Sequence, residues 1–135
     1  LELAARIGAD GVHLGHTDAA LSQARELLGP EAIVGISCYA DLERACRVEP
    51  YATYVAFGAF FPSATKPKAK LAPIELLSQA KAKLSCPIVA IGGITPENGA
   101  KLLAAGADLL AAIGGVFGHP DPRQAASCYA RLFKP

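Results

Sequence analysis

The chain has 135 residues, which is enough for one domain with a substantial apolar core and too few for two. The net charge of +1, without a block of basic residues, argues against nucleic acid as a partner. No apolar run reaches the ~18 residues that a membrane-spanning helix needs, so we expect no membrane association.

The four cysteines, at positions 38, 46, 86 and 128, show neither a Cys-x-x-Cys spacing nor a zinc-binding pattern with histidine. Each is embedded among apolar residues, as is typical of reduced, buried thiols in a cytoplasmic protein. The chain contains no methionine, and residues 1–7 resemble the end of a helix. We therefore expect a fragment or a processed piece of a longer chain.

Apolar segments and helical patterns alternate along the whole chain. Amphipathic spacing and good helix formers predict helices, with Asp41, Thr95 and Asp121 as N-caps and either Thr17 or Asp18 before the second helix. Gly8 is expected to end the first helix with a positive φ. The predicted helices are residues 1–7, 19–28, 42–48, 73–84, 97–105 and 122–133. The predicted strands are residues 11–15, 32–37, 54–61, 87–93 and 109–115.

The strands begin at intervals of 21, 21, 34 and 21 residues, and Gly-Ala-Asp occurs twice between a helix and a strand, at residues 8–10 and 106–108. Alternation at this period indicates βαβ units, a parallel sheet and right-handed crossovers. Both a barrel and an open doubly wound sheet fit this pattern. Paired glycines after the last two strands favour the barrel, in which such loops commonly bind phosphate through backbone N–H groups.

The third strand leads into the most informative stretch, residues 54–66. Its apolar run has no alternation, as in a strand buried on both faces. Pro62 follows, and then Ser63, Thr65 and Lys66 place two hydroxyls and a cation within four positions. Donors placed directly after a core strand are typical of an anion site at the carboxyl edge of a sheet, although a polar turn with a solvated lysine has the same composition.

Six motifs, in order, resemble the thiamine phosphate synthase family over nearly the whole chain. They are Gly11-Val-His-Leu-Gly15 with Asp18, Val34-Gly-Ile-Ser37, Tyr54-Val-Ala-Phe-Gly58, Phe61-Pro-Ser-Ala-Thr-Lys66, Pro87-Ile-Val-Ala-Ile-Gly-Gly-Ile94 and Gly106-Ala-Asp108. The resemblance implies a TIM (β/α)8 barrel present only as about five βα units, strands 4 to 8, with residues 1–135 as one partial barrel domain.

The resemblance also implies a transferase. The family joins 4-amino-2-methyl-5-pyrimidinylmethyl diphosphate to a thiazole phosphate, with Mg²⁺, and releases diphosphate and thiamine phosphate. Departure of diphosphate leaves a pyrimidine-stabilised cation that the thiazole nitrogen attacks, so the site must neutralise one phosphoryl group and hold another in line. The partners are then small molecules, and a homo-oligomer is left open.

Site roles follow from the motifs that match. Asp18 resembles a Mg²⁺ ligand, a role for which a helix N-cap is the structural alternative. Ser37 and Lys66 resemble the catalytic donors to the diphosphate. The thiazole-phosphate site is implied to consist of Ser63, Ala64, Thr65, Gly93, Ile113 and Gly114.

None of the three histidines is predicted to take part in the site. His13 lies in an apolar strand and is predicted to be a hydrogen-bonded core residue, whereas His16 and His119 are predicted at the surface.

The chain departs from the family at Ser63, commonly threonine, at Gly114, commonly serine, and at Tyr39, where many relatives have histidine.

The family's pyrimidine-side residues and a second acidic metal ligand are absent from this chain. We therefore predict that the 135-residue chain alone is inactive and unstable, since an unclosed sheet leaves an unpaired edge. Three other functions fit parts of the pattern: a thiazole tautomerase of the same fold, a non-catalytic phosphate-binding barrel fragment, and a phosphate-binding barrel enzyme of tryptophan or histidine synthesis. The tautomerase would require a histidine at Tyr39, and the last alternative would not require the Ser-Ala-Thr-Lys run.

Overall fold

A computed structural model describes residues 1–15 and 19–133, without side chains for residues 19 and 20. Five parallel strands form one sheet in the order of the sequence. They are β1 (Gly11–Leu14), β2 (Ile33–Tyr39), β3 (Tyr54–Phe57), β4 (Ile88–Ile91) and β5 (Leu109–Ala111). The helices are α1 (Glu2–Arg6), α2 (Ala19–Leu28), α3 (Leu42–Val48), the 3₁₀ helix η1 (Glu49–Tyr51), α4 (Glu75–Lys81), α5 (Pro96–Ala104), α6 (Gly114–Phe117) and α7 (Pro122–Arg131).

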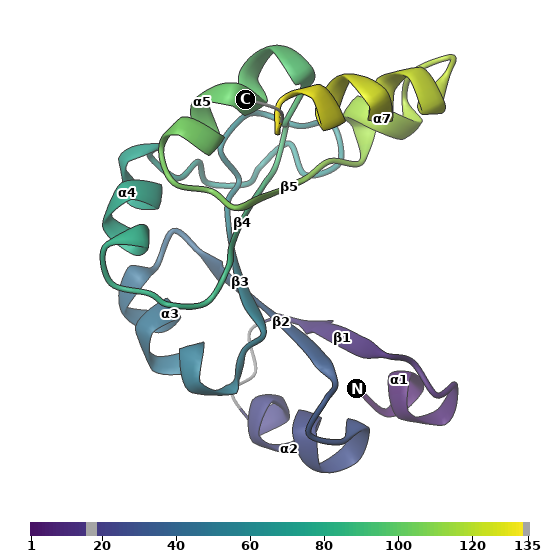
Figure 1. The fold of residues 1–135 in the computed structure, drawn as a ribbon, viewed down its shortest axis with the longest axis vertical. Helices are drawn as coiled ribbons and strands as arrows, with labels where there is room; N and C mark the ends of the chain where they lie inside the picture. Colours follow the sequence, from purple (N-terminus) through teal and green to yellow (C-terminus); the bar gives the residue numbers. More distant parts are fainter. Residues whose placement is uncertain (16–18, 134–135) are drawn as a thin grey trace.

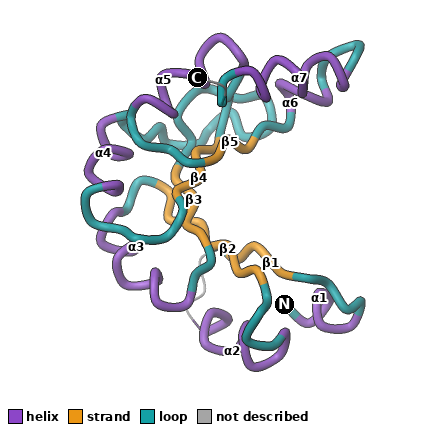
Figure 2. The backbone as a smooth tube through the Cα atoms, in the orientation of Figure 1, coloured by secondary structure: helices purple, strands orange, loops and turns teal. Residues whose placement is uncertain are grey.

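The sheet is strongly curved, with the strands on the inside of the arc and the helices outside it (Figures 1 and 2). A sequential strand order with helices on one face differs from a doubly wound sheet, in which helices cover both faces. The architecture is therefore α/β with a parallel, barrel-like sheet. No helix within the described ranges is both long and apolar enough to cross a membrane.

The core lies between the convex face of the sheet and the helices. Alternate strand residues such as Val34, Ile36 and Phe57 point outward and are fully buried there. The opposite, concave face leaves Ile33 and Leu109 about half exposed, at 51% and 47%. The instability of the chain alone stays a prediction.

Several local predictions are confirmed. Asp41 accepts a hydrogen bond from the Arg44 N–H at 2.8 Å, and Asp121 caps α7 in the same way through Gln124. Thr95 forms a capping box at the start of α5. Gly8 has a φ of +64°, as expected of the residue that follows a helix. The proposed caps Thr17 and Asp18 lie outside the described residues.

Several predicted boundaries are wrong. β3 ends at Phe57 because the chain turns at Gly58, where any Cβ would collide with the Ile91 carbonyl oxygen. The helix expected from position 73 begins at Glu75. The apolar run after position 109 is a short strand followed by α6, since apolar runs of this length do not distinguish strand from helix.

The thiols are only partly as predicted. All four cysteines are free, but only Cys38 is fully enclosed, whereas Cys46 is exposed on α3. Burial raises the pKa of the Cys38 thiol to about 12, despite the positive charge of nearby Arg44.

Candidate phosphate-binding site

The carboxyl ends of all five strands lie along one edge of the sheet, because neighbouring strands are parallel. Ser37 lies near the end of β2, residues 63–66 follow β3, Gly93 follows β4, and Ile113 follows β5. The fold therefore brings these predicted residues to one edge.

The loops that follow β3 and β4 are hydrogen-bonded to each other. The Phe60 N–H donates to the Ile91 carbonyl at 3.2 Å, and the Phe61 N–H donates to that of Gly92 at 3.1 Å. Gly93 has a φ of +63°, and a Cβ there would collide with the carbonyl oxygens of Phe61 and Pro62. Only glycine fits this close approach, so the segment preceding Ser63 and the paired glycines form one unit.

Gly93 is also fixed by the first turn of α5. Asn98 donates a hydrogen bond through Nδ2 to the Gly93 carbonyl at 3.0 Å, and its Oδ1 accepts one from the Thr95 N–H at 2.9 Å. Sequence reasoning missed Asn98. The Thr-Pro-Glu-Asn sequence, with an amide three residues after a threonine N-cap, is the signal that could have found it.

The segment 63–66 combines one fixed hydroxyl with exposed donors. Ser63 Oγ accepts a hydrogen bond from the Thr65 N–H at 3.2 Å, which closes a tight turn. Ala64, Thr65 and Lys66 are exposed. A lysine in this position can move its ammonium group toward an anion, since its flexible stem is not packed in the core.

The start of α6 is held close to the same region from the other side. A Cβ at Gly115 would collide with the Tyr129 hydroxyl and lie 2.7 Å from the Ile94 carbonyl oxygen. Tyr129 donates a hydrogen bond to that carbonyl at 2.7 Å. Ile113 and Gly114 are exposed beside this contact. Sequence reasoning missed Tyr129, which joins α7 to the segment after Gly93.

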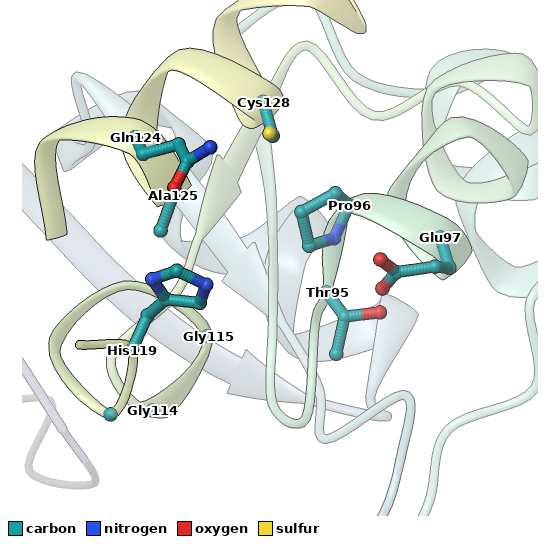
Figure 3. Close-up of a pocket in the computed structure, with 10 residues that line it drawn as sticks. Thr95, Pro96, Glu97, Gly114, Gly115, His119, Gln124, Ala125 and Cys128 are labelled. Atoms are coloured by element: carbon teal, nitrogen blue, oxygen red, sulfur yellow. The ribbon is translucent and has the colours of Figure 1, made fainter. Parts of the chain in front are cut away.

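A cavity of about 390 Å³ lies between the first turn of α5, α6 and α7. Thr95, Pro96 and Glu97 line one side, and His119, Gln124 and Cys128 line the other (Figure 3). Gly114 is its only residue among those predicted for the site, so the cavity is not the predicted phosphate site. His119 is exposed, as predicted.

Ser37 lies in a polar cluster on the concave face. Its Oγ is 2.9 Å from His13 Nε2, and His13 Nδ1 is 3.0 Å from the Tyr54 hydroxyl. The prediction that His13 is a core residue is wrong, because its side chain faces the open concave surface and is exposed. Periodicity alone does not tell the two faces of a parallel strand apart.

Arg44 is hydrogen-bonded to the ends of β1 and β2. It is 7% exposed, and it donates to the Ser37 carbonyl at 3.1 Å and to the Gly15 carbonyl at 2.8 Å. A buried guanidinium group thus connects the ends of β1 and β2. The pairing of β2 with β3 is irregular between Ser37 and Tyr39, and Tyr39 has a φ of +57°. Sequence reasoning assigned no role to Arg44.

The described residues do not by themselves complete a metal site. Asp18, the predicted Mg²⁺ ligand, lies outside them, and nowhere in residues 1–15 or 19–133 do three His, Cys, Asp or Glu side chains gather.

Comparison with known proteins shows the family to which this chain is similar. A family model described as thiamine monophosphate synthase matches residues 1–116. The thiamine-phosphate synthases of Methylococcus capsulatus and Nitrosococcus oceani are 56% and 54% identical over 132 residues, which cover 97% of this chain but 59% and 61% of theirs.

Among solved structures, the thiamine phosphate pyrophosphorylase of Pyrococcus furiosus is similar with a TM-score of 0.83 and 34% identity, over 97% of this chain and 62% of that one. The chain thus spans about three fifths of the length of these relatives. On the family match and these identities, the chain belongs to the thiamine monophosphate synthase family.

Proposed function

We propose that residues 1–135 are one partial barrel domain, strands 4 to 8 of a (β/α)8 barrel, in a cytoplasmic thiamine phosphate synthase. The complete protein would condense the aminopyrimidine diphosphate with the thiazole phosphate and release diphosphate. The observation that carries the proposal is the joined pair of loops after β3 and β4, where exposed donors at residues 63–66 follow a backbone fixed against Gly93.

The chemistry needs positioned donors more than a protein nucleophile. As the diphosphate departs, negative charge accumulates on its oxygens, and donors already in place stabilise that charge without further reorganisation. We assign this role to Ser37 and Lys66. The thiazole phosphate would be bound by Ser63, Thr65 and the backbone at positions 64, 93, 113 and 114.

Mg²⁺ is part of this proposal, with Asp18 as its ligand from this chain. A divalent cation, when bound, neutralises charge on the diphosphate oxygens. The relatives named thiamine-phosphate synthase favour the synthase over a thiazole tautomerase.

The test uses a hybrid protein, in which this chain is joined to the part of the Methylococcus capsulatus relative that it does not match. We expect the hybrid to form thiamine phosphate and diphosphate from the two substrates in the presence of Mg²⁺. Lys66→Ala should lower kcat/KM by roughly 100- to 1,000-fold, as the loss of one preorganised donor does.

Lys68→Ala is the matched control, because Lys68 is exposed in the same loop. It should leave kcat/KM within about twofold of the unmodified hybrid, since an exposed charge that contacts no substrate contributes little. A folded hybrid without product, or equal losses in the two lysine variants, would contradict the proposal.

A further inference from the structure

A row of three residues crosses the concave face of the sheet beside Ser37. His13 on β1 is paired with Gly35 on β2, and Gly35 is paired with Tyr54 on β3. The rings of His13 and Tyr54 are stacked, with centroids 5.6 Å apart, although a whole strand lies between their backbones.

Gly35 makes this contact across a strand feasible. A Cβ at that position would collide with the Tyr54 phenol ring and come within 2.6 Å of His13 Nδ1. The missing side chain therefore leaves the space in which the two rings meet. Because a side chain at Gly35 would keep the two rings apart, the hydrogen-bonded cluster depends on the residue types at all three positions.

The hydrogen bonds run in series from Tyr54 through His13 to Ser37. The Tyr54 hydroxyl lies 3.0 Å from Nδ1 of the imidazole, and Ser37 Oγ lies 2.9 Å from Nε2. Partial burial lowers the pKa of His13 below its usual value of 6.5. A neutral imidazole has one donor and one acceptor nitrogen, so the two bonds must point in the same direction along the series.

The direction decides what Ser37 can do. If Tyr54 donates to Nδ1, then Nε2–H donates to Ser37 Oγ, and the single hydroxyl hydrogen of Ser37 remains available for a ligand. In the opposite direction Ser37 donates to Nε2, and its hydrogen is already used. A phenol is the more acidic hydroxyl and the better donor, which favours the first arrangement.

We propose that Tyr54 and His13 are positioning residues that hold the Ser37 hydroxyl hydrogen toward a phosphoryl oxygen of the departing diphosphate. This rests on the proposed function, because Ser37 is the group that touches the diphosphate. The two aromatic residues act only through it. Their contribution is to remove the alternative orientation of the Ser37 hydroxyl before substrate binds, which is a form of preorganisation.

The first measurement is the tautomer of His13 in the hybrid protein, read from imidazole ¹⁵N chemical shifts and Nε2–H couplings. We expect the hydrogen on Nε2 and an unprotonated Nδ1. Tyr54→Phe keeps the ring but removes the donor, so the tautomer should become mixed. A hydrogen on Nδ1 in the unmodified protein would overturn the proposal, whether or not the hybrid is active.

The second measurement is the kinetics of three variants. His13→Ala should lower kcat by roughly 10- to 100-fold, as the loss of an outer partner of a functional group commonly does. His13→Gln should recover part of that loss, since an amide N–H can donate to Ser37 Oγ. Tyr54→Phe should lower kcat by about 10-fold with little change in the KM of either substrate.

Tyr51→Phe is the matched control, since Tyr51 is exposed outside the cluster, and it should leave kcat unchanged. Unchanged kcat in His13→Ala and Tyr54→Phe would also overturn the proposal. So would equal losses in His13→Gln and His13→Ala with a lowered melting temperature in both, because that result indicates packing alone. If the unmodified hybrid forms no product, the proposed function fails, while the tautomer still tests the orientation of Ser37.

Discussion

Arg44 is the residue whose replacement tests most directly how the strand ends are held. Methionine keeps most of the buried stem and removes the guanidinium group, which donates to the Ser37 carbonyl at 3.1 Å and the Gly15 carbonyl at 2.8 Å. Because the side chain is 7% exposed, water does not readily replace these bonds. The two carbonyl groups that lose their donor are neutral, so the loss of stability is smaller than it would be if a buried charge lost its partner.

The magnitude follows from these contacts. A hydrogen bond from a charged donor contributes about 1.5–3 kcal/mol, so these two bonds together contribute about 3–6 kcal/mol. The charge no longer has to be desolvated in the variant, which offsets part of this loss. We therefore expect Arg44→Met to lower the free energy of unfolding by about 3 kcal/mol.

Urea unfolding of the hybrid protein, followed by circular dichroism, measures this difference through the transition midpoint at an unchanged slope. Arg47→Met is the matched control, because Arg47 is exposed on the same helix and its loss should cost within about 0.5 kcal/mol. Equal midpoints for the two variants would refute the reasoning that Arg44 joins β1 to β2.

Further predictions concern Asp108 and the cysteines. Asp108 accepts hydrogen bonds from Lys81 Nζ at 2.6 Å and from the Ile88 N–H at 2.9 Å. Burial by itself would raise the pKa of the carboxyl group, but these bonds lower it below the ordinary value. Its stabilising contribution should be present above pH 3.8, the ordinary pKa, and disappear as the pH falls through the lower folded-state value. Asp108→Ala removes the acceptor of the Ile88 N–H, so it should lower the free energy of unfolding in urea by about 1–3 kcal/mol. Lys81→Ala should lower it by under about 1 kcal/mol, since that ion pair is partly exposed. A larger loss in Lys81→Ala than in Asp108→Ala would contradict this. In the native protein at about pH 8, iodoacetamide should modify Cys46 and spare Cys38, read by mass spectrometry of peptides, and modification of Cys38 at the same rate would contradict its enclosure. Because its folded-state pKa is raised to about 12, the contribution of Cys38 to stability should be lost as the pH rises from 9.0 toward that value.

Structural features that depend on residues close together in the sequence could be predicted from it. The N-caps at Asp41, Thr95 and Asp121 satisfy backbone N–H groups only three residues away, so they could be predicted from the order of residues alone. The βα alternation predicted a parallel sheet, because it follows from the spacing of apolar segments.

The sequence by itself determined the order of the five strands and of the longer helices, three helix caps and the family motifs. Only the tertiary structure decided which face of each strand its residues occupy, because the strands of a parallel sheet can be apolar on both faces. For this reason the sequence predicts His13 in the core and does not mark its partners Ser37 and Tyr54, 24 and 41 residues away, as members of one cluster. The sequence gives no sign of the role of Arg44 for a related reason. Its acceptors are backbone carbonyl groups at two strand ends, and every residue has a carbonyl, so no pattern of side chains marks them.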